Sequence, residues 1–391
     1  MRPSAISLPA FALLAMLAAC KPATGSATVD AGAPAGGQAV ASTQGQGRLS
    51  VLARGLSHPW AVAPLPDGGF LVTERGGTLR RVAADGTVSA PLAGVPAVSA
   101  RGQGGLLDVV LAPDFAHSRR IYLSYAEPDG NGLSGTTAAW ARLGDTGLEE
   151  VTVIYRQQPR LDTENHYGSR LAFDDHGHVF ISQGERTRRI MAQQLDVLQG
   201  KLVRLNLDGS VPDDNPFVGQ AGARPEIWSY GHRNSQGLAF DPRTGKLWES
   251  EHGPRGGDEI NLPQPGRNYG WPVVTHGINY SGQPIPEAVG ESKDGMEPPH
   301  FVFEVSPALS GMAFYTGRPG QPWNDSLFLG ALAQRQLIRL QLQGDQVVGE
   351  ERLLQDLGER IRDVRLGPDG NLYLVTDEDD GKLLKLEPPR H

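Results

Sequence analysis

The sequence is poor in cysteine, in excess basic charge and in long helical patterns. Cys20 is the only cysteine, so the chain cannot form an intrachain disulfide. Lysine and arginine (36 together) are outnumbered by aspartate and glutamate (44), and the net charge of −8 argues against a nucleic-acid partner. No segment has a long helical period, although residues 188–198 could form a short helix. These absences favour an acidic protein built mainly from strands.

The N-terminus has the pattern of an export signal. Arg2 precedes a mostly apolar run at 8–19 that is too short to span a bilayer. The run closes with LAAC, and small residues before a cysteine resemble a bacterial lipobox, in which Cys20 becomes the lipidated first residue of the mature protein. A plain signal peptide with an accidental cysteine is the alternative. We therefore expect export to the periplasm, with membrane contact only through a lipid anchor at Cys20.

The composition changes twice along the chain. Residues 21–48 are rich in Ala, Gly, Ser and Thr and poor in large apolar side chains, which is typical of a flexible tether. We therefore predict a lipoprotein-type signal peptide at 1–20, a tether at 21–48 and a single folded domain at 49–391.

A degenerate unit recurs six times in the folded domain. Each copy has an apolar segment, a turn containing aspartate, an alternating strand and a charged loop, and the 50 glycines and 30 prolines of the chain suit such turns. The copies lie at 64–82, 112–127, 173–186, 240–253, 315–342 and 366–387. The turn aspartates are Asp67, Asp114, Asp175, Asp241, Asp325 and Asp369. This repetition predicts an all-β fold, a six-bladed β-propeller of four-stranded antiparallel blades. A twisted sandwich or two small β domains are the alternatives.

The two ends of the domain are predicted to close the ring. Residues 48–56 form a strand pattern that precedes the first copy, and residues 382–388 end the last copy. Pairing these two strands would seal the propeller and hide its edges.

Polar residues precede the copies at matching positions, where the innermost strands of a propeller converge on its axis. They are Gln103, His166, Arg233 with Asn234, Ser310 with Gly311, and Arg360 with Arg362. Each alone is weak evidence, because a lone histidine is more often a surface or core residue and an arginine is usually solvated or paired. Several arginines facing one cavity, however, need an anion, because like charges repel in a dry site. Together with the dense polar clusters of 230–271, they predict a site for an anionic, oxygen-rich ligand with a hard cation.

Several blocks of this sequence resemble a known family. The blocks are GQGGLLD, NHYGSRLAF, GHRNSQGLAF, ESEHGPRGGDEINL, RNYGWP and RIRDV, and they look like those of the soluble glucose and aldose sugar dehydrogenases that depend on pyrroloquinoline quinone (PQQ). The resemblance covers about 49–388, and it implies a six-bladed propeller. It also implies oxidation of the C1 hydroxyl of an aldose sugar to a lactone, with hydride transfer to PQQ and an electron acceptor that the sequence does not identify.

The resemblance assigns roles to the polar residues around the axis. His166 matches the general base, a task that suits a group with a pKa near neutrality. Glu185 matches a carboxylate that orients this base, although the glucose enzyme has Asp there. Arg233 and Asn234 match the pair that contacts the quinone oxygens, where a cation stabilises developing negative charge. The cofactor carboxylates would be gripped by Gln103, Arg360 and Arg362.

The resemblance also implies two calcium sites. The backbone carbonyls of Gly253 and Pro254 match ligands of the calcium ion that PQQ chelates, and calcium accepts neutral carbonyl oxygens readily. Glu259 and Tyr269 match a second, structural calcium site, to which Tyr280 could contribute. Alternatively, Glu259 only caps a turn or pairs with a nearby arginine, Arg255 or Arg267.

The chain departs from the glucose enzyme at several positions. Ala333 stands where that enzyme has a lysine that reaches the cofactor, with Arg335 nearby, and His252 stands where it has Gln. The long insertions that help the glucose enzyme to dimerise are absent. These departures place the chain in the aldose sugar dehydrogenase branch and favour a monomer over a dimer.

Two other functions fit a six-bladed propeller. One is a calcium-dependent lactonase or esterase, which would surround its metal with carboxylate and Asn ligands rather than arginines. The other is a binding propeller without catalysis. Arginines around the axis would repel a metal unless an anionic cofactor intervened, which argues against the first. The joint presence of His166, Arg233, Asn234, Arg360 and Arg362 argues against the second, and the propeller fold alone decides nothing because it hosts many functions.

Overall fold

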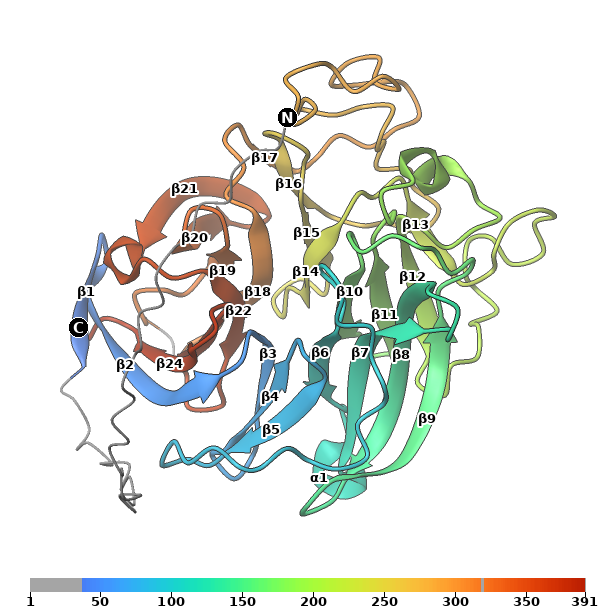
Figure 1. Cartoon of the computed structure of the whole chain (residues 1–391). Coiled ribbons are helices and arrows are strands. Elements are labelled where there is room, and N and C mark those ends of the chain that lie inside the picture. The colour runs from blue at the N-terminus through green and yellow to red at the C-terminus, as the bar shows by residue number, and fades with distance from the viewer. Residues whose placement is uncertain (1–36, 318–319, 391) are drawn as a thin grey trace, which may run out of the picture. The chain divides into compact units, whose positions relative to one another are not determined.

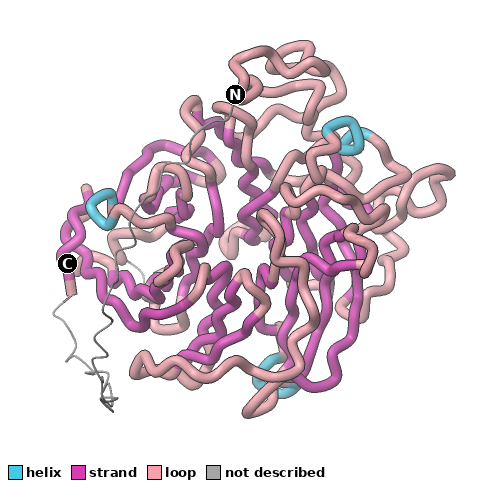
Figure 2. The backbone as a smooth tube through the Cα atoms, viewed as in Figure 1, coloured by secondary structure: helices cyan, strands magenta, loops and turns pink. Residues whose placement is uncertain are grey.

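The computed structural model describes residues 37–317 and 320–390, whose strands form six antiparallel sheets around a central axis (Figure 1). Helix is confined, within this part of the chain, to α1 (Phe115–Ser118) and to the 3-10 segments η1 (Arg189–Gln193) and η2 (Gln355–Leu357) (Figure 2). The predicted helix at 188–198 is therefore reduced to one short 3-10 segment. No helix among the described residues has the length and apolar character needed to cross a bilayer.

Each blade is formed from strands that follow one another along the chain. Blade 1 contains β3 (Pro59–Pro64), β4 (Phe70–Glu74) and β5 (Thr78–Val82). Blade 2 contains β6 (Leu106–Leu111), β7 (Arg120–Pro128), β8 (Ser134–Leu143) and β9 (Leu148–Arg156). Blade 3 contains β10 (Gly168–Phe173), β11 (His178–Gln183), β12 (Lys201–Asn206) and β13 (Ile227–Tyr230).

The remaining blades complete the ring. Blade 4 contains β14 (Ser235–Phe240), β15 (Leu247–Glu251), β16 (Asp258–Asn261) and β17 (Phe301–Phe303). Blade 5 contains β18 (Leu309–Tyr315), β19 (Ser326–Ala331), β20 (Gln336–Gln343) and β21 (Gln346–Leu353). Blade 6 contains β22 (Ile361–Leu366), β23 (Leu372–Thr376), β24 (Gly381–Glu387) and, from the start of the domain, β2 (Gly45–Leu56) and β1 (Gln38–Ser42).

The first strands of the blades, β3, β6, β10, β14, β18 and β22, contact one another in a closed circle. Six buried apolar clusters fill the spaces between neighbouring blades, one cluster for each of the six pairs. Burial of apolar surface between the blades is therefore the main force that closes the ring. The six-bladed β-propeller predicted from the repeats is confirmed, and all six turn aspartates lie between the first and second strands of a blade.

The closure predicted for the two ends is also confirmed. β2 pairs with β24 in antiparallel register, with Leu49 opposite Leu386 and Val51 opposite Leu384. Blade 6 therefore joins the start of the domain to its end, and its inner strands leave no free edge between them.

The predicted start of the folded domain near residue 49 is wrong. β1 pairs with β2 from Gln38 to Ser42, so the ordered structure includes the last part of the predicted tether. Val40 is buried in the cluster between blades 5 and 6, and the Ser42 hydroxyl donates a hydrogen bond to Glu351 (3.1 Å). One buried valine and a ladder of main-chain hydrogen bonds thus order a segment whose composition predicted flexibility. The signal peptide at 1–20, Cys20 and residues 21–36 lie outside the described residues.

The first strand of every blade starts in an irregular register. In all six blades the pairing between the first and second strands shifts register near the start of the first strand, for example between Gly168 and Leu171 and between Ser235 and Gly237. Such bulges release residues from the ladder and redirect their side chains. Residues within four of these shifts line the central cavity described below, namely Trp60, Leu107, Gln236 and Arg362.

Candidate functional site

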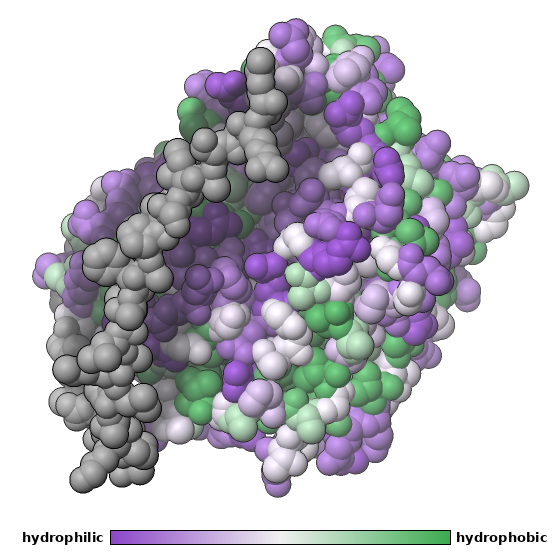
Figure 3. All heavy atoms as spheres, viewed as in Figure 1, coloured by the Kyte–Doolittle hydropathy of each residue, from purple (hydrophilic) through white to green (hydrophobic). Residues whose placement is uncertain are grey.

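A cavity of about 560 Å³ lies where the starts of the six first strands converge. It has the volume of a small-molecule site. Every blade contributes to it, and four of the predicted cofactor residues line it, namely Gln103, Asn234, Arg360 and Arg362. Hydrophilic residues predominate in the hollow near the middle of the face shown in Figure 3. In blade 5 the predicted Ser310 and Gly311 do not line the cavity, and Ala308 and Leu332 take that place.

His166 lies beside this cavity, directly before the lining residues Tyr167 and Gly168. Its backbone is in the left-handed region (φ 55°), and its amide N–H donates to the Gln103 side chain (2.8 Å). Its Nδ1 lies 2.6 Å from Oε2 of the buried Glu185. The longer side chain of glutamate therefore reaches the imidazole, and the structure brings the predicted base and its orienting carboxylate into direct contact.

The Glu185 carboxylate is itself held in place. Its Oε2 also accepts the amide N–H of Thr187 (2.7 Å), and its own amide donates to the Arg233 carbonyl (2.9 Å). With Nδ1 of His166 engaged by Glu185, Nε2 is the ring nitrogen left without a protein partner in the described part of the chain. This arrangement presents one imidazole nitrogen in a defined orientation.

The other two histidines at the cavity are less suited to proton transfer. Both ring nitrogens of His58 face carboxylates, Nδ1 at 2.9 Å from Asp377 and Nε2 at 2.8 Å from Asp379. Nε2 of His252 lies 2.5 Å from the Leu309 carbonyl, to which it donates. Burial lowers the pKa of His252 to about 4, which makes it a weak base.

Arg233 and Arg362 are buried guanidinium groups without a carboxylate partner in the described part of the chain. Arg362 is 7% exposed and donates to Oε1 of Gln236 (2.7 Å), and burial, followed by the nearby Arg170 guanidinium, lowers its pKa to about 9. Arg233 is 6% exposed and donates to the His252 carbonyl (3.0 Å), but its Nε has no partner. An uncompensated buried cation is costly, so both residues favour an anionic ligand.

Arg360 differs from these two arginines. Its Nε and Nη2 lie 3.2 and 3.1 Å from the Asp377 carboxylate, and more than a third of its side chain is exposed. Of the three predicted arginines, Arg360 therefore has a carboxylate partner, whereas Arg233 and Arg362 have none among the described residues. Arg360 still lines the cavity, but its charge is already balanced within the chain.

Asn234 is placed by two hydrogen bonds. Its Oδ1 accepts the amide N–H of Gly168 (3.2 Å) and the side-chain amide of Gln236 (3.1 Å). The first of these bonds connects blade 3 to blade 4 at the level of the cavity. The side chain therefore helps to fix the relative position of the segment that carries His166.

The carbonyl groups of Gly253 and Pro254 fit a hard cation. Both residues line a second cavity of about 650 Å³, which shares His252, Tyr280 and Ala308 with the central one. The loop is held by Asp258, whose carboxylate accepts the amide N–H groups of Gly253 (3.0 Å) and Leu309 (3.1 Å). Within the described residues neither carbonyl accepts a hydrogen bond, so their oxygens are free to bind a metal ion.

Glu259 has the surroundings of a carboxylate that lacks a cation. Burial and the neighbouring Glu251 carboxylate raise its pKa well above the usual range, and it makes no ion pair with Arg255 or Arg267 among the described residues. The backbone carbonyl of Tyr269 likewise accepts no hydrogen bond in this part of the chain. These two groups fit the second calcium site better than they fit the alternative of an arginine pair.

A neighbouring cluster already contains its own cation. Nδ1 of His232 lies 3.0 Å from Glu249 and 3.4 Å from Glu251, and its ring stacks on Tyr269 with centroids 5.0 Å apart. Burial alone would lower the pKa of His232, but the two carboxylates raise it to about 10. The protonated imidazole therefore supplies one positive charge against two glutamates, and with Glu259 the cluster has three carboxylates for one cation.

Several lining residues were missed by the sequence analysis. They are His58, Trp60, Arg75, Gln236 and Asp377. Trp60 could have been found, because SHPWAVAPL stands before the first repeat copy just as the Gln103, His166 and Asn234 segments stand before later copies. Asp377 follows the second strand of blade 6, a position that the repeat comparison did not include.

Comparisons with known proteins identify the family of this chain. The family model described as glucose / sorbosone dehydrogenase matches residues 56–385. An aldose sugar dehydrogenase of Escherichia coli (strain K12) is 56% identical over 344 residues, which are 87% of this chain and 92% of that protein. A solved structure of a glucose dehydrogenase is 62% identical with a TM-score of 0.85, covering 86% of this chain and 98% of that one.

A third relative was solved with a cofactor. The PQQ-bound form of an aldose sugar dehydrogenase from Streptomyces coelicolor is 30% identical with a TM-score of 0.72, covering 87% of this chain and 98% of that one. On the family match and these relatives, the chain belongs to the glucose/sorbosone dehydrogenase family.

Proposed function

We propose that this protein oxidises the C1 hydroxyl of aldose sugars to lactones with PQQ and calcium. The observation that carries the proposal is the pair of buried guanidinium groups, Arg233 and Arg362, which have no carboxylate partner among the described residues. Arg362 lines the central cavity, and Arg233 donates to the backbone carbonyl of the lining residue His252. A planar quinone with several carboxylates would supply the missing negative charge. The PQQ-bound relative from Streptomyces coelicolor supports the choice of cofactor.

The residues present fit this cofactor in a specific way. Arg362 and Arg360 would bind its carboxylates, together with the Gln103 side chain, and Arg233 and Asn234 would contact the quinone oxygens. The carbonyl oxygens of Gly253 and Pro254 would hold the calcium ion. When bound, the quinone supplies a hydride acceptor and the calcium ion a Lewis acid that polarises it.

His166 would act as the general base. The proton of the C1 hydroxyl would move to Nε2 while the hydrogen on C1 leaves as hydride, so that the alcohol carbon becomes the carbonyl carbon of a lactone. Glu185 would hold the imidazole in the tautomer with the proton on Nδ1 and stabilise the imidazolium that forms. Arg233 would stabilise the negative charge that develops beside it.

The test of this function is reconstitution. Apoprotein supplied with PQQ and Ca²⁺ should reduce an artificial electron acceptor when an aldose is added, and a panel of mono- and oligosaccharides would define the substrate. The absence of sugar-dependent reduction would contradict the proposal. Hydrolysis of a lactone without PQQ would instead favour a propeller lactonase, and cofactor or sugar binding without turnover would favour a binding propeller.

Removing the charge of Glu185 should slow the reaction without loss of bound PQQ. We expect Glu185→Gln to lower kcat roughly tenfold to a hundredfold, less than the full contribution of about 10²–10⁴ from general-base catalysis. Glu185→Asp is the matched control, because it keeps the charge but its shorter side chain withdraws the carboxylate from the 2.6 Å contact with His166. Both variants should retain PQQ affinity. Unchanged kcat in both would show that the contact does not assist the base.

Calcium should stabilise the apoprotein through Glu259. Without PQQ, saturating Ca²⁺ at a hundredfold excess over its Kd should add about 2.7 kcal/mol to the unfolding free energy, measured as a Tm increase that a chelator reverses. Glu259→Gln should lose this response, because the amide brings no negative charge to the site. Glu297→Gln is the control, since Glu297 pairs with Arg267 at the surface. An equal calcium response in Glu259→Gln would place the ion elsewhere.

We further propose that the protein is exported and acts in the periplasm as a lipid-anchored monomer. The basis is the apolar run that ends in LAAC at Cys20, and the absence from the sequence of the long insertions expected for the dimeric glucose enzyme. Metabolic labelling with a radioactive fatty acid should mark the wild type and not Cys20→Ser. Sedimentation of the soluble domain would establish its oligomeric state.

A further inference from the structure

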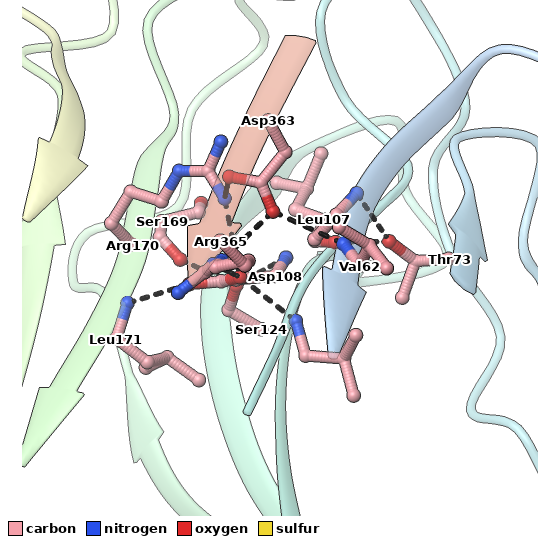
Figure 4. Close-up of polar contacts among 12 residues, drawn as sticks. Val62, Thr73, Leu107, Asp108, Ser124, Ser169, Arg170, Leu171, Asp363 and Arg365 are labelled. Carbon is pink, nitrogen blue, oxygen red and sulfur yellow. Dashed lines mark hydrogen bonds and ion pairs between the residues drawn. The ribbon is translucent and has the colours of Figure 1, made fainter. Parts of the chain in front are cut away.

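A closed ring of four charged side chains lies on the axis of the propeller, one layer deeper along the strands than the cavity lining. Arg170 contacts Asp363 (2.9 Å) and Asp108 (3.3 Å), and Arg365 contacts the same two aspartates at 2.9 and 2.6 Å (Figure 4). Two positive and two negative charges make the ring neutral. A buried ion-pair network of this kind is stable only when all its members are satisfied.

The aspartates of the ring also bind the backbones of other blades. Asp108 of β6 accepts the amide N–H of Leu171 in β10 (2.9 Å), and Asp363 of β22 accepts that of Val62 in β3 (3.1 Å) (Figure 4). The ring thus connects blades 1, 2, 3 and 6. This much would be explained by a purely structural role.

Arg170 makes additional contacts that Arg365 does not make. Its Nε donates to the Gln236 carbonyl (2.8 Å), its Nη2 donates to the Arg362 carbonyl (3.2 Å), and its guanidinium lies 4.1 Å from the centroid of the Trp60 ring. Gln236, Arg362 and Trp60 all line the central cavity, whereas Arg170 does not. With the ring aspartates included, this one side chain in blade 3 contacts residues of four other blades, namely 1, 2, 4 and 6.

The three lining residues that Arg170 contacts are also in contact with one another. The Arg362 guanidinium lies 4.2 Å from the centroid of the Trp60 ring and donates to Oε1 of Gln236 (2.7 Å). Arg362, Gln236 and Trp60 therefore form one unit, which we call the cavity floor. Arg170 contacts the Trp60 ring and the backbone carbonyls of Gln236 and Arg362 from the deeper side of this floor.

We propose that Arg170 is a positioning residue for the cofactor, because it sets the geometry of the cavity floor. The proposal rests on the function given above, in which this cavity binds PQQ. Only a planar guanidinium with five N–H donors can satisfy two carboxylates, two carbonyls and an aromatic face together, and a lysine ammonium has three donors. Arg365 serves the ring alone, since within the described residues it contacts Asp108 and Asp363 but no residue of the floor.

The test compares two substitutions that damage the same ring. Arg170→Lys and Arg365→Lys each replace one ring guanidinium, and their Tm values without cofactor report the structural loss. PQQ affinity would be measured by calorimetric titration of the apoprotein in saturating Ca²⁺. We expect Arg170→Lys to weaken PQQ binding about tenfold to a hundredfold, as displacement of a site by a distant substitution can. Arg365→Lys should bind PQQ as the wild type does, even where its Tm falls equally.

Trp60→Phe is the second variant, and it tests whether the cavity floor controls PQQ affinity if Arg170→Lys does not fold. It leaves all four ring members in place but removes much of the aromatic face that both guanidinium groups contact, so PQQ binding should weaken. Trp60 is buried in the core between blades 1 and 2, and the Tm of this variant reports separately what the smaller ring costs the fold. Equal PQQ affinity in the two lysine variants, or wild-type affinity in Trp60→Phe, would overturn the proposal. A wild-type protein that does not bind PQQ would instead contradict the proposed function itself.

Discussion

Replacement of His166 by glutamine should reduce kcat by about 10²–10⁴-fold, the usual contribution of a general base, while PQQ still binds. Glutamine has a similar reach and can keep a hydrogen bond to Glu185, but it cannot accept the proton of the C1 hydroxyl. Turnover would be followed with an artificial electron acceptor, and PQQ binding by titration of the same preparation. The two readouts separate loss of chemistry from loss of the cofactor.

The control for this prediction is His252, a second histidine at the cavity, which unlike His166 forms no ion pair with a carboxylate among the described residues. His252→Gln should change kcat far less, because Nε2 of His252 already donates to the Leu309 carbonyl and burial lowers its pKa to about 4. A large loss of activity in His252→Gln, with little loss in His166→Gln, would exchange the two roles. Loss of PQQ binding in His166→Gln would make His166 a structural residue.

The fold could be predicted from the sequence because its signals are local. An aspartate turn followed by an alternating strand needs only about twenty neighbouring residues, and six such units permit few closed arrangements. The site residues could be located for the same reason, since Gln103, His166 and Asn234 occupy matching places before the repeat copies. The closure of β2 on β24 then followed from the need to hide two edges.

The contacts that the sequence did not predict are those between residues far apart in the chain. Asp108 and Arg365 form an ion pair across 257 positions, and nothing local marks either as a partner of the other. Asp377 reaches Arg360 only because the β22–β23 hairpin places them side by side. Composition also did not predict strand β1. Its sequence is typical of a flexible tether, but the buried side chain of Val40 and main-chain pairing with β2 hold it against the domain.

These long-range pairs decide which of the axial arginines matters most to the cofactor. Three arginines at matching positions are equivalent in the sequence, but Asp377 compensates Arg360, whereas the described residues offer the Arg362 guanidinium only the side-chain amide oxygen of Gln236 and the face of Trp60. The ring below is neutral and offers Arg362 no negative charge of its own. The positive potential available to an anion is therefore concentrated at Arg362 and Arg233.

Substitution of Arg362 by methionine should accordingly separate cofactor affinity from stability. Loss of a buried, charged contact to a PQQ carboxylate should cost about 2–4 kcal/mol of binding, which is roughly a 30- to 1000-fold increase in Kd. The apoprotein should keep its unfolding free energy within about 1 kcal/mol, because no ion pair is lost and an apolar side chain replaces an uncompensated buried charge. Arg360→Met should raise the Kd less, since Arg360 is partly exposed and already paired. Calorimetric titration with PQQ and thermal unfolding of the three apoproteins measure both quantities. Wild-type affinity in Arg362→Met would remove the main electrostatic reason for placing an acidic quinone in this cavity. It would show that the buried Arg362 guanidinium does not bind the anion and serves only the fold.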